Sequence, residues 1–94
     1  MQENYIRIRS VKIMTVNVEI YINHSGLEKD LKELLEHKYS GRFRQLPEAD
    51  TNDSKIYRIR VNGDETTKGL ADSIEHALLS KFEELELKLY NTVN

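Results

Sequence analysis

The sequence predicts an α+β fold, a two-layer sandwich in which two helices pack on one face of a mainly antiparallel sheet of three to four strands. Three observations indicate it. Apolar and polar residues alternate from Tyr5 to Ile22, and they alternate again from Lys55 to Val61, as they do along strands. After each of these runs, leucines recur at helical spacing. The expected order of elements is β(β)αββα.

The first alternating segment is longer than a usual strand, so we expect a bend or bulge near Ser10 to Lys12, where the apolar face is interrupted. A hairpin is less favoured, because no glycine, proline or Asn-Gly pair is present to form its turn. The pattern is compatible with one bent strand or with two. The apolar face comprises Ile6, Ile8, Met14, Val16, Val18, Ile20 and Ile22.

A capping box at the start and a glycine at the end delimit the first helix. Ser25 can accept from a free backbone N–H while Glu28 reaches back to the cap, and Gly41 supplies a left-handed stop. We expect this helix to run to about Tyr39. Its apolar stripe comprises Leu27, Leu31, Leu34 and Leu35.

Two short strands and a second helix complete the predicted fold. The strands are Arg42 to Leu46, with Phe43 toward the core, and Lys55 to Val61. A threonine at 66 or 67 can cap the final helix, which we expect from about Lys68 to Tyr90. The apolar face of that helix comprises Leu70, Ile74, Leu78, Phe82, Leu85 and Leu89.

Length and composition favour a single small binding domain over residues 1–94. A chain of 94 residues builds one thin core, which leaves little room for an enclosed active-site cavity. The absence of cysteine and of any export or membrane-spanning pattern favours a soluble, cytoplasmic protein. A net charge of −2 disfavours a general nucleic-acid coat, although basic residues can still gather locally. No family signature is recognised.

All six arginines lie in Arg-x-Arg pairs on predicted strands, whereas the eight lysines are scattered elsewhere. Period-two geometry places both members of a pair on the sheet face opposite the core, together with Tyr5, Glu19 and Tyr21. Guanidinium groups and tyrosine rings can bind phosphates, carboxylates and bases, or the arginines can pair with Glu19 across strands. The candidate binding residues are Arg7, Arg9, Arg42, Arg44, Arg58, Arg60, Tyr5 and Tyr21.

The outward arc of the final helix is expected to be acidic, with a leucine and a tyrosine among its carboxylates. Acidic solvated helix faces are ordinary, but exposed apolar residues in such a ridge also suit a protein contact or self-association. This candidate interface comprises Asp72, Glu75, Leu79, Glu83, Glu86 and Tyr90.

The functional expectation is a non-enzymatic regulatory or accessory protein that docks an anionic partner, nucleic acid or an acidic protein surface, on its arginine-rich sheet face. The first alternative is a self-associating module that uses the long acidic helix. The second is an enzyme whose site is assembled from distant residues. No catalytic residue, metal site or small-molecule cofactor is predicted, because neither the histidines nor the glycines match a known site pattern. A protein partner or homo-oligomer is expected, nucleic acid is a further candidate, and a membrane is not.

Overall fold

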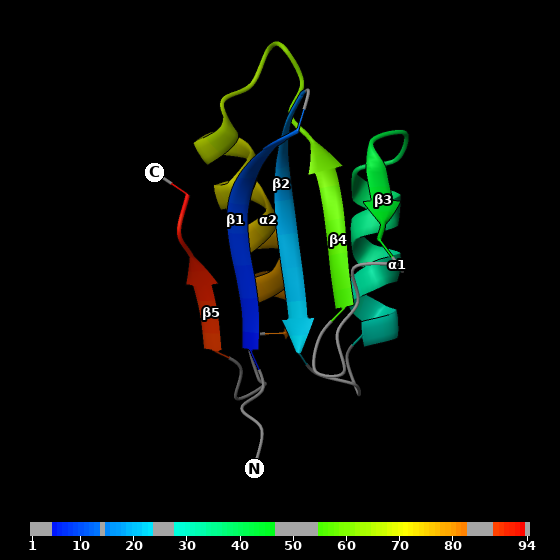
Figure 1. Cartoon of the computed structure of the whole chain (residues 1–94). Coiled ribbons are helices and arrows are strands. Elements are labelled where there is room, and N and C mark those ends of the chain that lie inside the picture. The colour runs from blue at the N-terminus through cyan, green and yellow to red at the C-terminus, as the bar shows by residue number, and fades with distance from the viewer. Residues whose placement is uncertain (1–4, 14, 24–27, 47–54, 83–87, 94) are drawn as a thin grey trace.

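The computed structural model describes residues 5–13, 15–23, 28–46, 55–82 and 88–93. These residues form a five-stranded sheet and two helices, which confirms the α+β class (Figure 1). Three strand pairings are antiparallel and one is parallel, so the sheet is mixed and larger than expected. In chain order the elements are β1 (Tyr5–Ile13), β2 (Thr15–Asn23), α1 (Glu28–Lys38), β3 (Phe43–Gln45), β4 (Lys55–Arg60), α2 (Thr67–Phe82) and β5 (Lys88–Asn91).

Both helices lie behind the same face of the sheet, whose strand order is β3-β4-β2-β1-β5 (Figure 1). The core between the layers is formed by the even positions of β1 and β2, the odd positions of β4 and the inward faces of both helices. We call the opposite side of the sheet, which neither helix covers, the open face. The largest fully buried core side chains include Ile6, Ile8, Ile20, Ile22, Leu31, Leu35, Tyr57, Ile59, Leu70, Ile74 and Leu78.

Residues 5–23 form a hairpin, and the expected break at Ser10 to Lys12 is wrong. The antiparallel ladder runs through those positions without a bulge, and the chain reverses between Ile13 and Thr15. Odd-numbered residues of β1 pair with odd-numbered residues of β2, as Arg9 does with Glu19. The apolar alternation therefore continues through the reversal, which made two strands look like one long strand.

The end of α1, strands β3 and β4 and the start of α2 lie close to their expected positions. Gly41 adopts a φ of 87° where the chain leaves α1 for β3, a left-handed conformation that glycine reaches without steric cost. Phe43 packs against the core and stacks on Tyr57. The Thr66 hydroxyl accepts from the Gly69 backbone N–H at 2.9 Å, which caps α2. The proposed capping serine of the first helix, Ser25, lies outside the described residues.

The final helix is shorter than the leucine spacing suggests, and its expected extension to Tyr90 is wrong. Helix α2 ends at Phe82, and residues 88–91 form β5, which pairs in parallel with β1. Leu85, Leu87 and Leu89 alternate with Glu86, Lys88 and Tyr90, so strand periodicity was also present in this segment. Leu89 packs against the core and Tyr90 is 40% exposed, as that alternation predicts.

Candidate functional site

The open face is cationic because five arginines of the described strands meet one acidic residue there. Strand register places Arg7, Arg9 and Tyr21 on this face, and it places Arg58 and Arg60 opposite Glu19 and Asn17. Arg44 is the cross-strand partner of Arg58. Glu19 is the only Asp or Glu in the five described strands. The described acidic residues otherwise lie on the helices and in the turn before α2.

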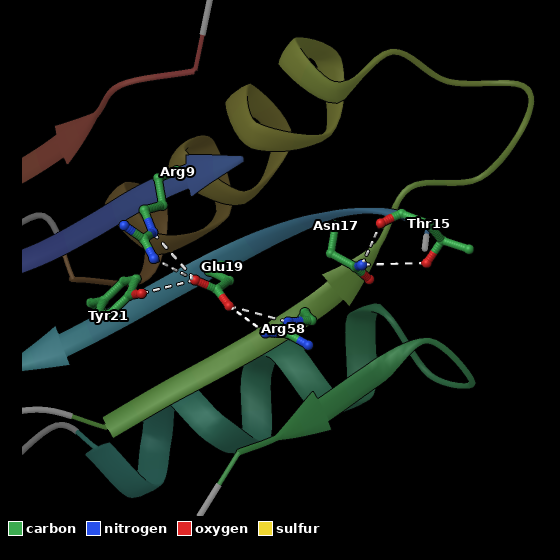
Figure 2. A network of polar contacts seen from close by, with 6 residues as sticks. All are labelled: Arg9, Thr15, Asn17, Glu19, Tyr21 and Arg58. Atoms are coloured by element: carbon green, nitrogen blue, oxygen red, sulfur yellow. Dashed lines mark hydrogen bonds and ion pairs between the residues drawn. The ribbon is translucent and has the colours of Figure 1, made fainter. Parts of the chain in front are cut away.

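Glu19 lies at the centre of the open face and binds two of these arginines (Figure 2). Its Oε1 accepts from the Arg9 Nε and Nη2 atoms, both at 3.2 Å, and from the Tyr21 hydroxyl at 2.8 Å. Its Oε2 accepts from the Arg58 Nη2 at 2.6 Å and Nε at 3.2 Å. Glu19 is only 3% exposed, so these bonds replace almost all of its hydration. The cross-strand pairing alternative therefore holds for Arg9 and Arg58.

This network favours an ionised Glu19 and a protonated Tyr21. Burial raises the pKa of Glu19, but hydrogen bonds from Arg58, Tyr21 and Arg9 outweigh it, and the net pKa lies below the ordinary value. Burial raises the pKa of Tyr21, and the adjacent Glu19 carboxylate raises it further. Glu19 therefore stays ionised and Tyr21 stays protonated around neutral pH.

Four arginines surround one depression of about 440 Å³ beside this network. The Arg42 guanidinium pairs with Glu65 and lies 5.3 Å from the centre of the Tyr39 ring. Arg44 and Arg60 are exposed, and neither forms an ion pair with any residue that the structure describes. We call this site the arginine depression, and it is lined by Thr15, Asn17, Gly41, Arg42, Arg44, Arg58 and Arg60.

The opposite corner of the open face carries a cluster of aromatic rings and one guanidinium group. Arg7 faces Tyr90 across the parallel β1 and β5 strands. Its Cζ atom lies 5.5 Å from the centre of the Tyr5 ring and 6.0 Å from that of Tyr90. The two rings meet edge to face, with centroids 6.3 Å apart. We call Tyr5, Arg7 and Tyr90 the tyrosine platform.

The structure brings the sequence-predicted binding residues together in two groups. Arg42, Arg44, Arg58 and Arg60 share the arginine depression, whereas Tyr5 and Arg7 belong to the tyrosine platform. Arg9 and Tyr21 lie between them, with the Arg9 Cζ 4.9 Å from the centre of the Tyr21 ring. All three Arg-x-Arg pairs thus contribute to the open face or to its rim.

The candidate helix interface is divided by the fold. Asp72, Glu75 and the 46% exposed Leu79 lie on α2, where Asp72 bonds Lys68 and the Asn91 amide. Glu83 and Glu86 lie outside the described residues. Tyr90 belongs to β5 and not to this helix. In its described length, α2 carries two acidic residues and two lysines, so it is not an acidic ridge.

Three residues of the arginine depression and one residue of the tyrosine platform were not predicted from the sequence to lie there. Thr15, Asn17 and Gly41 line the arginine depression, and the Asn17 amide donates to the Thr15 carbonyl at 3.0 Å. The odd position of Asn17 in an alternating segment is the signal that places it on the open face. Tyr90 joins the platform because its segment is a strand.

The described part of the chain was compared with the requirements of a metal-ligand cluster and of a membrane-spanning helix. No group of three or more His, Cys, Asp or Glu side chains there is arranged to hold a metal ion. No helix among the same residues is long and apolar enough to cross a bilayer. His24 lies outside the described residues.

Comparisons with known proteins leave the site as the main guide to function. No family model, no curated protein and no solved structure matches this chain. The arginine depression and the tyrosine platform are therefore the features from which a function has to be inferred.

Proposed function

We propose that this chain is a binding protein without catalytic activity, and that the open face docks a nucleic acid through its phosphate groups. The arginine depression is the observation that carries the proposal. Guanidinium groups present planar donor forks that match phosphate oxygens, and four of them converge on one depression of about 440 Å³. A site of that volume lies within the range of ordinary ligand pockets.

Internal pairing accounts for only part of this positive charge. Arg58 is bound to Glu19 and Arg42 to Glu65, so these two guanidinium groups are held in fixed positions. Arg44 and Arg58 are direct cross-strand partners, an arrangement in which like charges repel. A phosphate bound between Arg44, Arg58 and Arg60 would relieve that repulsion, which supports an anionic ligand at this point.

The test removes the two arginines that have no described ion pair. We expect Arg44→Ala with Arg60→Ala to weaken binding to a fluorescein-labelled 20-nucleotide DNA, measured by fluorescence anisotropy at several salt concentrations. For a single strand, each lost phosphate contact reduces the slope of log K against log salt by about 0.7, so two reduce it by about 1.4. Arg58 is left in place, because its removal would leave Glu19 buried without one of its partners.

A matched control removes two cations from the helix layer. Lys29→Ala with Lys81→Ala changes the net charge by the same amount at two exposed positions of α1 and α2. This variant should bind DNA with nearly the wild-type salt slope. Equal losses in the two variants would contradict a specific arginine site, and so would the absence of binding to DNA at low salt. Tighter binding to poly-glutamate than to DNA would instead indicate an acidic protein partner.

A further inference from the structure

We infer that the nucleic acid bound on the open face is single-stranded, and that the tyrosine platform stacks its bases. This inference rests on the proposed function, because it assigns a second group of residues to the same docking face. The platform supplies ring faces where the arginine depression supplies charge. Together they offer one contact for the base of a nucleotide and another for its phosphate.

The platform is a built arrangement of side chains from two strands. Arg7 and Tyr90 are direct partners in the parallel register, and Tyr5 lies two positions before Arg7 on the same face of β1. The edge-to-face contact between the rings and the guanidinium position near both of them limit the rotamers that each side chain can adopt. Tyr90 is nevertheless 40% exposed, so ring surface is accessible to a ligand.

Exposed aromatic rings of this kind discriminate between single and double strands. Bases in a duplex stack on one another and present only their edges in the grooves, whereas unpaired bases can stack on aromatic side chains or on guanidinium planes. Stacking on an aromatic side chain changes affinity by roughly 5- to 150-fold per base. A single strand can use the tyrosine platform, and a duplex cannot.

The separation of the two sites suits an extended strand. The platform lies on β1 and β5, and the depression lies on β2, β3 and β4, at the other corner of the sheet. Neighbouring strands are about 4.8 Å apart, so β5 and β4 are separated by roughly 14 Å. Arg9 and Tyr21 occupy the face between them, with the guanidinium over the ring. A single strand of several nucleotides can therefore cross the face from one site to the other.

The first experiment compares three nucleic acids with the wild-type protein. The probes are a mixed-sequence 20-nucleotide single strand, the same length of abasic single strand, and the duplex of the first sequence. We expect the normal single strand to bind at least 5-fold more tightly than either of the others. Since the chain has five tyrosines and no tryptophan, tyrosine fluorescence should be quenched by the normal strand and not by the abasic one.

The second experiment changes the platform. Tyr5→Leu with Tyr90→Leu should reduce binding of the normal strand to that of the abasic strand. Tyr5→Phe with Tyr90→Phe retains both rings and should bind like the wild type. If the leucine variant fails to fold by circular dichroism, the abasic comparison and the phenylalanine variant still test the inference.

The outcomes distinguish failure of this inference from failure of the proposed function. Equal wild-type affinity for the normal and abasic strands, or preference for the duplex, overturns base stacking and leaves phosphate docking intact. Absence of binding to all three nucleic acids overturns both. A single-strand preference that persists in the leucine variant overturns the assignment to Tyr5 and Tyr90.

Discussion

Arg58 of β4 and Glu19 of β2 face each other across the centre of the sheet, with the Arg58 Nη2 atom 2.6 Å from the Glu19 Oε2 atom. The same carboxylate binds Arg9 of β1 through its other oxygen. One buried acidic residue therefore connects the three central strands on the face that we propose to bind an anion. It also fixes the position of Arg58 in the wall of the arginine depression.

Glu19→Gln should destabilise the protein and tighten anion binding. The amide cannot neutralise Arg9 and Arg58, so we expect the free energy of unfolding to fall by about 2 kcal/mol in urea denaturation. The two released guanidinium groups become available to a ligand, and DNA affinity at low salt should rise. Glu75→Gln on α2 removes the same charge away from the sheet and should change stability by less than about 0.5 kcal/mol. Weaker DNA binding by Glu19→Gln would contradict the proposed role of the open face.

The stabilising effect of Glu19 should disappear in acid. Its folded-state pKa lies below 4.5, its ordinary value, because the arginine and tyrosine hydrogen bonds outweigh burial. Below pH 4.5 the unfolded chain binds the proton before the folded protein does. The stabilisation by Glu19 is therefore fully present above pH 4.5 and is lost as pH falls through the folded pKa. The difference in unfolding free energy between wild type and Glu19→Gln should shrink in urea titrations from pH 7 to pH 3. A constant difference over that range would contradict the assignment.

The same pH range affects a second carboxylate, that of Glu65. A variant of this residue separates its contribution to stability from that of Glu19. The pKa of Glu65 is also lowered, because its bonds to the Asn62 N–H and Arg42 outweigh burial. We expect Glu65→Gln to lose stability relative to wild type at neutral pH and to approach it below pH 4.5. If the two sites are independent, their losses should add within about 0.5 kcal/mol in the double variant.

Thr66→Ala should destabilise the protein through the N-terminus of α2. The hydroxyl accepts from the Gly69 N–H at 2.9 Å, and loss of a threonine cap costs about 1 kcal/mol. Thermal denaturation followed by circular dichroism measures the change. Thr67→Ala is a matched control, since no cap bond from Thr67 occurs among the described residues. Equal destabilisation by both substitutions would contradict the cap assignment.

Val93→Ala should weaken the attachment of the segment that carries Tyr90. Val93 is 6% exposed in the core cluster, and the preceding Thr92 N–H donates to the Ile8 carbonyl at 3.0 Å. Removing two buried methyl groups should cost about 1 to 2 kcal/mol in urea denaturation. Thr92→Ser retains the hydroxyl that also bonds Ile8 and should have a smaller effect. Full wild-type stability of Val93→Ala would contradict the packing of this segment.

Periodicity predicted the side-chain faces better than it predicted chain connections. The odd positions of β1 and β2 lie on the open face as expected, because the hairpin register pairs odd with odd. No glycine or proline marks the reversal between β1 and β2, so the sequence does not predict it. At the other end, Leu85 and Leu89 fit both a helical period and a two-residue period. Only the pairing with β1 distinguishes a strand from a helix in this segment, and sequence spacing does not show which strands pair.

The candidate site was predictable by residue type and face but not by grouping. The Arg-x-Arg pattern identified all four arginines of the depression. Strand order decides that the pair at the start of β3 and the pair on β4 meet there while Arg7 does not. The role of Glu19 as the shared partner of Arg9 and Arg58 depends on side-chain geometry across three strands. Tyr90 reached the open face through a parallel pairing that its sequence neighbours do not indicate.

The parallel pairing of β5 with β1 also has a kinetic consequence. The contact between Thr92 and Ile8 joins residues 84 positions apart, whereas the β1–β2 hairpin joins near neighbours. Long-range contacts form late, because closing a large loop costs conformational entropy before any stabilising contact is made. During synthesis, the hairpin and its arginines can therefore assemble while Tyr90 is still untranslated. Arg7 and Arg9 of the hairpin therefore precede the second platform ring, Tyr90, in the order of synthesis.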